Sequence, residues 1–195
     1  MVKTRVSIPK PVRDQVLKEY SHRCSRCGGD SPQLHHIDEN PSHNDPLNLI
    51  PLCPNCHHNW FHNPLSGIES DRLQFFRIYK HPLILKPQFS PLFKRLQFLG
   101  DVDKTDADNL RASAGELISF VKAHEMGEFY SGKIAGLLRY PEYTASVSIG
   151  MDGRVPQWYV NGKNNERPQY LAQLKNAKER VYELVVEMLA YQQWS

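Results

Sequence analysis

Three stretches of the sequence decide the fold of the first half of the chain: R-C-S-R-C-G-G (23–29), L-H-H-I-D (34–38) and N-L-I-P-L-C-P-N-C-H (48–57). They contain all four cysteines, as two C-x-x-C pairs with 25 residues between the pairs. Gly, Pro, Asn and Ser surround the pairs, so the backbone can curl and direct thiolates to one point. This spacing suits a tetrahedral zinc ion, and we predict a structural zinc site of Cys24, Cys27, Cys53 and Cys56.

Competing interpretations of the cysteines are weaker. The opening M-V-K-T-R-V-S-I-P-K-P-V-R-D has no apolar stretch suited to a signal peptide, and apolar runs are far shorter than the about 20 residues of a membrane helix. We therefore expect a cytoplasmic protein without a membrane partner, where reduction disfavours disulfides. A redox C-x-x-C lacks a thioredoxin-like strand pattern here, and the residues between the cysteines are not core types. Four thiolates also fill the ligand set of zinc, so this metal can hold the fold but cannot activate water.

The residues between the cysteine pairs predict two short strands, 33–37 and 48–52, joined by a polar loop, 38–47. A short helix is predicted to start at Pro54 or Asn55. Adjacent residues of a strand point to opposite faces, so His35 and His36 cannot have the same role. His57, in the first helical turn, can approach one of them.

Taken together with both C-x-x-C pairs, the His pair, the Asn and the His after the last cysteine resemble the HNH endonuclease family, in the type with a four-cysteine zinc site around a ββα-metal active site. The resemblance covers roughly residues 5 to 63 and includes a short helix expected in S-I-P-K-P-V-R-D-Q-V-L-K-E-Y (7–20). It implies hydrolysis of phosphodiester bonds with a catalytic divalent metal, leaving 5′-phosphate and 3′-hydroxyl ends.

The resemblance assigns a role to each motif residue. It implies that His35 is a ligand of the catalytic metal, that His36 is the general base, that Asn48 holds the loop and the base in position, and that His57 is the second metal ligand. Two departures concern the surroundings: Phe61 stands where some members have a further histidine, and Pro41 follows the pair later than is common. Whether His58 or His62 is an additional ligand stays open.

The chemistry explains the choice of residue types. A neutral imidazole, which titrates near pH 6.5, can take a proton from water at cellular pH. A divalent ion with few protein ligands keeps positions open for the phosphate and the leaving oxygen. Imidazole ligands allow Mn²⁺, Ni²⁺ or Zn²⁺, and Mg²⁺ remains allowed where water and phosphate complete its shell. DNA is the expected substrate, in a prokaryotic antiviral defence or restriction setting; the alternatives are an RNA-directed nuclease and a non-catalytic zinc module that binds nucleic acid or protein.

Charge is distributed unevenly along the chain. The net charge is +3, yet residues 1–100 hold 13 Lys and Arg against 8 Asp and Glu, and eight of the nine histidines precede residue 82. A polyanion should therefore meet the first half. Arg23 and Arg26, beside the cysteines, are the preferred nucleic-acid contacts, with a solvated surface as the alternative for each basic residue. No recognition helix is evident, so sequence specificity is not inferred.

The second half predicts apolar helix faces without a catalytic constellation. Helices are expected at 68–79, at 91–99, after a cap at 105–108 and at 168–194, with a β-hairpin of 143–149 and 155–160. We therefore expect an α+β protein: a zinc-stapled ββα-metal HNH module (1–80), a linker or connecting helix (81–104) and a mainly helical region with one hairpin (105–195). That last region suits regulation, formation of a homo-oligomer or binding of a partner protein.

Overall fold

The computed structural model describes residues 7–61, 69–141 and 155–192, and it is a mixed α+β structure in which helix predominates. A two-stranded antiparallel sheet provides the β component. The first part of the chain forms these elements: α1 (Lys10–Glu19), β1 (Gln33–His36), η1 (Pro46–Asn48), β2 (Leu49–Leu52), α2 (Pro54–Cys56), η2 (His57–Phe61), α3 (Ser70–Tyr79), η3 (Pro82–Leu85) and η4 (Pro87–Phe89). The rest forms these: α4 (Ser90–Leu96), η5 (Gln97–Leu99), α5 (Ala107–Lys122), α6 (Gly127–Leu138) and α7 (Gln157–Leu189).

The chain divides into two compact units, Met1–Ser90 and Pro91–Ser195. The division lies within the 81–104 stretch that the sequence analysis assigns to a linker. Residues 82–89 belong to the first unit, where η3 packs on α3 and three of its side chains, Leu83, Ile84 and Leu85, are buried. None of the described helices combines the length and the apolar character that a membrane span requires.

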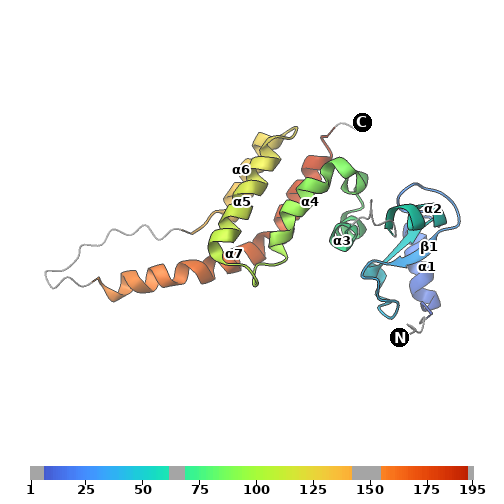
Figure 1. The fold of residues 1–195 in the computed structure, drawn as a ribbon, viewed down its shortest axis with the longest axis horizontal. Helices are drawn as coiled ribbons and strands as arrows, with labels where there is room; N and C mark the ends of the chain where they lie inside the picture. The colour runs from blue at the N-terminus through green and yellow to red at the C-terminus, as the bar shows by residue number, and fades with distance from the viewer. Residues whose placement is uncertain (1–6, 62–68, 142–154, 193–195) are drawn as a thin grey trace. The chain divides into compact units, whose positions relative to one another are not determined.

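The sheet of the first unit confirms the predicted pair of strands. β1 and β2 pair in antiparallel register, with His35 opposite Ile50 and His36 opposite Leu49 (Figure 1). All four residues of β2 are buried, whereas β1 buries His35 and leaves its neighbours more accessible. α1 packs against β2 and η1, with Val16 fully buried. The hairpin is therefore held from one side by a helix that the sequence analysis expected before the first cysteine.

The short helix that contains the last cysteine has an unusual form. α2 contains only Pro54–Cys56, and the chain continues as a five-residue π-helix, η2, from His57 to Phe61. Pro54 occupies the first helical position, where its missing N–H costs no hydrogen bond. A π-turn within a helix frequently marks a functional site, because it changes the direction in which side chains project.

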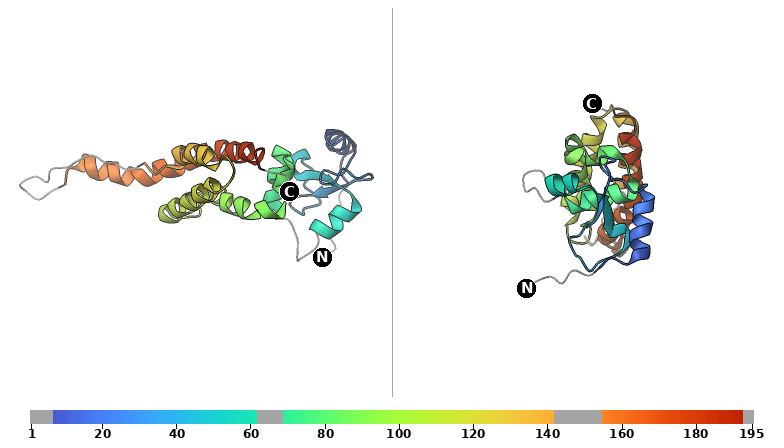
Figure 2. Two further views of the ribbon diagram at one scale, coloured as in Figure 1. Left: turned by 90° about the horizontal axis from the view of Figure 1, so that it is seen from above. Right: turned by 90° about the vertical axis from the view of Figure 1, so that its right-hand side faces the viewer.

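The second unit is helical in its described part. α5 packs on α6 and α7, and α6 packs on α7. The left view of Figure 2 shows α6 beside α7. The predicted cap of α5 is confirmed, because the Asp106 side chain accepts hydrogen bonds from the amides of Asp108 and Asn109. The buried faces carry the apolar residues of the core, including Leu110, Leu117, Ile134, Leu174, Val181, Leu184 and Met188.

Two expectations for the second unit are wrong in the described residues. The predicted second strand of the hairpin, 155–160, is replaced by the start of α7 at Gln157, while its partner 143–149 lies outside the described residues. α7 also begins eleven residues before Pro168, where the sequence analysis placed its start. Proline removes one helical hydrogen bond and crowds the preceding turn, yet Pro168 lies inside α7, where it is exposed.

The sequence analysis does not predict α6, because three glycines and a serine weaken its helical pattern. Its first residue, Gly127, is required by space: a Cβ there would collide with the main-chain carbonyls of Val121 and Lys122 at the end of α5. The chain turns sharply before it, with Met126 in the left-handed region at φ 58°. Burial of Tyr130, Ile134 and Leu138, at intervals of four, is the helical signal that the glycines obscured.

Candidate functional site

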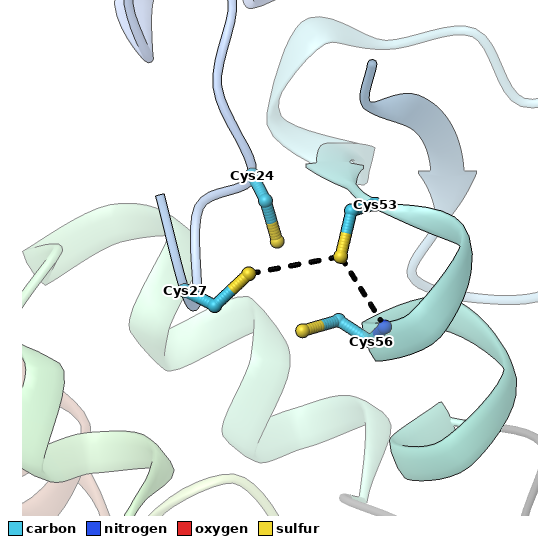
Figure 3. A group of neighbouring side chains, drawn as sticks. All are labelled: Cys24, Cys27, Cys53 and Cys56. Atoms are coloured by element: carbon cyan, nitrogen blue, oxygen red, sulfur yellow. Dashed lines mark hydrogen bonds between the residues drawn. The ribbon is translucent and has the colours of Figure 1, made fainter. Parts of the chain in front are cut away.

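The four cysteines converge from two separate turns, as the zinc prediction requires (Figure 3). Cys24 and Cys27 come from the loop before β1, and Cys53 and Cys56 from the junction of β2 with α2. All four Sγ atoms lie within 4.8 Å of one another. Three of the four side chains are buried, and Cys27 is exposed. The four sulfur atoms are therefore close enough to bind one metal ion together.

The distances suit zinc rather than disulfides. The Sγ atoms of Cys27 and Cys53 are 3.6 Å apart, whereas a disulfide has a bond of about 2.05 Å. Four sulfurs placed about 2.3 Å from one tetrahedral zinc ion would be about 3.8 Å apart. All four cysteines are free thiols. The donor set is therefore the closed four-sulfur type, which supports structure and leaves no ligand position for water.

Backbone amides support the sulfur atoms in both turns. The Gly29 amide donates to Cys27 Sγ and the Cys56 amide donates to Cys53 Sγ, each over 3.4 Å. Gly28 has φ 71°, a left-handed conformation that glycine adopts without steric cost and that lets the chain close the first turn. Amide hydrogen bonds of this kind stabilise thiolate charge.

The thiols differ in how readily they ionise. Burial raises the pKa of Cys24, but hydrogen bonds from the backbone amides of Cys27, Cys53 and Arg26 outweigh it and lower the pKa to about 7. Burial and the neighbouring thiols raise the pKa of Cys56 above its usual value. The cluster thus favours the thiolate of Cys24 and opposes that of Cys56. A divalent cation removes that opposition, because it stabilises every thiolate that it binds.

The cysteine cluster also positions the histidines. The Ser25 amide donates to the Pro51 carbonyl over 2.9 Å, which ties the first cysteine turn to β2. His57 follows Cys56 directly, and its own amide donates to the Cys53 carbonyl over 2.9 Å. The turn that carries Cys53 and Cys56 is therefore continuous with the element that presents His57 toward the sheet.

His35 and His57 lie in contact, as the sequence interpretation of a shared metal requires. His35 Nδ1 is 3.2 Å from His57 Nε2, and their rings meet edge to face with centroids 5.0 Å apart. Two imidazole nitrogens bound about 2.05 Å from one tetrahedral ion would be about 3.3 Å apart. His35 is 8% exposed. The pair can therefore hold one ion between β1 and η2, or form a direct imidazole hydrogen bond.

Among the residues that the structure describes, no third His, Cys, Asp or Glu joins this pair in a metal-binding group. His58 is exposed on η2, and His62 lies outside the described residues. A metal at His35 and His57 would therefore take its remaining ligands from water or from a substrate.

His36 points away from the imidazole pair, as alternation along a strand demands. Its Nε2 atom is 3.0 Å from Asn44 Oδ1, a partner that the sequence analysis missed. His36 also lines a cavity of about 510 Å³ between α1 and the start of β1, whose wall includes Arg13 and Gln33. The Asn44 contact spans the polar loop, and no periodic pattern in the sequence indicates it.

Asn48 is buried, 3% exposed, and holds the polar loop together. Its Oδ1 accepts from the Asp38 amide over 3.1 Å, and its Nδ2 donates to Asp38 Oδ1 over 2.8 Å and to the His43 carbonyl over 2.9 Å. Asp38 Oδ2 in turn lies 2.6 Å from His43 Nδ1. Burial opposes ionisation of Asp38, but the hydrogen bonds from His43 and Asn48 lower its pKa to about 2. Asn48 therefore occupies a place in the fold where it can fix the loop between the two strands.

The two arginines predicted to contact nucleic acid lie beside the cysteine turn. Arg23 Nη1 is 3.0 Å from Asp30 Oδ1 and donates to the Gly28 carbonyl over 3.1 Å. Arg26 is half-buried, and its backbone amide supports Cys24. Arg23 thus stabilises the turn of Cys24 and Cys27, and nucleic-acid contact by either residue stays a prediction.

Comparison with known proteins adds no relative. No family model, curated protein or solved structure matches the chain.

Proposed function

We propose that this chain is a metal-dependent endonuclease of the HNH type that hydrolyses phosphodiester bonds in DNA. The observation that carries the proposal is the 3.2 Å contact between His35 Nδ1 and His57 Nε2, two residues 22 positions apart. The resemblance to the HNH family implies that both are metal ligands, and that implication does not depend on their distance. Their separation matches the about 3.3 Å that a shared tetrahedral ion would require.

The zinc cluster and the imidazole pair would have separate tasks. The four cysteines leave zinc no open position, so their metal holds the fold of the first unit. A divalent ion at His35 and His57 would neutralise charge on the phosphate and on the leaving oxygen. The chain's own contribution is to hold these imidazoles on β1 and η2, which the cysteine turns connect.

His36 is the proposed general base, and its contact with Asn44 supports that role. An amide oxygen only accepts hydrogen bonds, so Asn44 Oδ1 at 3.0 Å favours the proton on His36 Nε2. The lone pair then lies on Nδ1, which can take a proton from the attacking water. Asn44 would therefore select the tautomer that suits a base.

Arg13 is the proposed phosphate contact near this base. Its side chain is exposed, and it lines the same cavity of about 510 Å³ as His36. No ion pair or side-chain hydrogen bond involves its guanidinium among the described residues. A guanidinium fork matches the geometry of a phosphate, so Arg13 could bind the backbone of a strand that lies over His36.

Cleavage of supercoiled plasmid by the full, zinc-loaded chain tests this proposal. After removal of loosely held metal, we expect no cleavage until Mg²⁺, Mn²⁺ or Ni²⁺ is added, and nicked product afterwards. An RNA of matched length, incubated in parallel, separates a DNA nuclease from an RNA-directed one.

A non-catalytic zinc module is the competing function, because the four cysteines alone would support it. In that case the two imidazoles form only a packing hydrogen bond, and no nucleic acid is cut with any metal. Nucleic-acid binding with unchanged substrate under every metal condition would favour this alternative and contradict the proposed nuclease.

A further inference from the structure

α3 contributes a buried arginine to the centre of the first unit. Arg77 has a side chain that is only 2% exposed, and its Nη1 lies 2.8 Å from Glu19 Oε2 at the end of α1. Its guanidinium carbon lies 5.5 Å from the centre of the Tyr20 ring. The hydrogen bond from Arg77 is the largest influence that keeps the pKa of Glu19 below its usual value. A buried charge of this kind requires several partners, because desolvation is costly.

The remaining donors of Arg77 go to the main chain around Asn48. Nε donates to the Leu49 carbonyl over 2.9 Å, and Nη2 donates to the Pro46 carbonyl over 3.0 Å. These two carbonyls lie on either side of Asn48, at the passage from η1 into β2. One rigid guanidinium fork therefore holds the backbone on both sides of Asn48.

Asn48 transmits that constraint to the loop beside His36. Its side chain binds Asp38, which comes two residues after His36, and the carbonyl of His43, which comes one residue before Asn44. Asn44 is the residue that contacts His36. These hydrogen bonds, together with the one- and two-residue backbone steps between them, thus link α3 to the imidazole that we assign as the base.

We propose that Arg77 is a positioning residue for His36, acting through the backbone of Pro46 and Leu49, through Asn48 and through the loop that carries Asn44. The catalytic consequence rests on the proposed nuclease function. The positioning itself does not, because the orientation of the His36 ring can be measured without any reaction.

Arg72 provides a matched control on the same helix. It is also buried, 6% exposed, and its guanidinium donates to the carbonyls of Ile84 and Lys86. These acceptors lie in and just after η3, away from the Asn48 segment in the chain. A five-residue separation places the two arginines on different faces of α3. Arg72→Lys therefore removes a similar guanidinium fork without touching the loop of His36.

The test compares Arg77→Lys and Arg72→Lys in the full, zinc-loaded chain. Lysine keeps the charge beside Glu19 but cannot bridge both carbonyls. In Arg77→Lys we expect kcat for DNA cleavage to fall about 10- to 100-fold, since small displacements of a catalytic group have effects of that order. KM and zinc content should stay within about twofold, because neither the phosphate contact nor the cysteines are altered.

Nuclear magnetic resonance of the histidine rings gives a second readout that does not depend on cleavage. We expect the His36 ring nitrogen signals to shift in Arg77→Lys and to stay in place in Arg72→Lys, even where both variants lose similar thermal stability. If Arg77→Lys does not fold, Glu19→Gln replaces it. This change keeps the arginine, weakens its anchor on α1 and should shift the same signals in the same direction, by less.

The outcomes distinguish the positioning role of Arg77 from the proposed nuclease function. Equal effects of Arg77→Lys and Arg72→Lys on kcat and on the His36 signals would overturn the positioning role, because both arginines would then be merely structural. If the parent chain cuts nothing, the proposed function fails, and the ring signals alone decide whether Arg77 positions His36. A loss confined to KM would also contradict the proposal, since it would place Arg77 in substrate binding.

Discussion

Replacing Asn48 by Ala should release the loop between the two strands while leaving the hairpin paired. The side chain of Asn48 forms three hydrogen bonds, two of them with Asp38 and one with the His43 carbonyl. The main-chain carbonyl of Asn48 accepts separately from the Ile37 amide over 2.8 Å, and alanine retains that bond. The substitution therefore removes a defined set of contacts.

The size of the effect follows from these three bonds. A neutral hydrogen bond contributes about 1 kcal/mol and one to a charged carboxylate about 1.5–3 kcal/mol, so the sum is about 4 kcal/mol. Asp38 and His43 are exposed, and water can replace part of what they lose. We therefore expect the free energy of opening the loop to fall by about 2 kcal/mol, which corresponds to about 30-fold in the opening equilibrium.

Amide hydrogen exchange measures this opening residue by residue. The Asp38 amide loses its acceptor in Asn48→Ala and should exchange about 30-fold faster, whereas the Ile37 amide keeps its partner and should change much less. Asn40→Ala is the matched control, because the Asn40 side chain is exposed and accepts only from the Ser42 amide among the described contacts. Unchanged protection of the Asp38 amide in Asn48→Ala would refute the reasoning that Asn48 holds this loop.

Three further predictions concern the zinc cluster, the phosphate contact and the extent of the first unit. Cys56→Ser should reduce bound zinc from about one ion per chain to near zero by elemental analysis and should unfold the first unit, since metal binding supplies much of the folding free energy of such modules; full zinc retention would contradict the four-cysteine site. Arg13→Gln should lower the salt dependence of DNA binding by about one phosphate contact, whereas Lys18→Gln, the same charge change on α1 away from the cavity, should have a smaller effect; equal effects would remove Arg13 from the site. A fragment ending at Ser90 should fold and hold zinc. A fragment ending at Lys80 lacks the three buried side chains of η3, so its free energy of unfolding should be lower by about 5 kcal/mol of apolar burial. Equal thermal stability of both fragments would show that η3 does not belong to the first unit.

The first unit could be predicted from the sequence because its signals are local. The cysteine spacing, the two short strands and the turn residues between them act over a few positions each, and the structure brings the four cysteines together as expected. The strand and the cysteine before His57 indicated that His57 could approach either His35 or His36, and only the resemblance to the HNH family selected His35.

Contacts that depend on tertiary packing could not be predicted in the same way. Asn44 reaches His36 only because the loop folds back, and Arg77 reaches Pro46 and Leu49 from a helix about 30 residues later. From the sequence alone, a single arginine on a helix is predicted to be a surface residue. These contacts determine how the proposed base is held.

The second unit was harder to predict from the sequence, because its sequence signals conflict with its structure. Residues 155–160 alternate as a strand would, but the chain there enters α7 after Pro156, whose restricted φ also suits the start of a helix. Six residues of alternation do not outweigh the long helix that follows, which packs on α5 and α6.

Cleavage by His36→Ala, compared with the parent chain, tests the central claim most directly. His22→Asn is the control: His22 is exposed and has φ 56°, a backbone conformation that asparagine tolerates well. With equal zinc content and equal DNA binding in all three proteins, we predict that His36→Ala cuts plasmid about 10² to 10⁴ times more slowly in the presence of added divalent metal, while His22→Asn cuts like the parent. Cleavage by His36→Ala at the parental rate would contradict the account, because the base would then lie elsewhere.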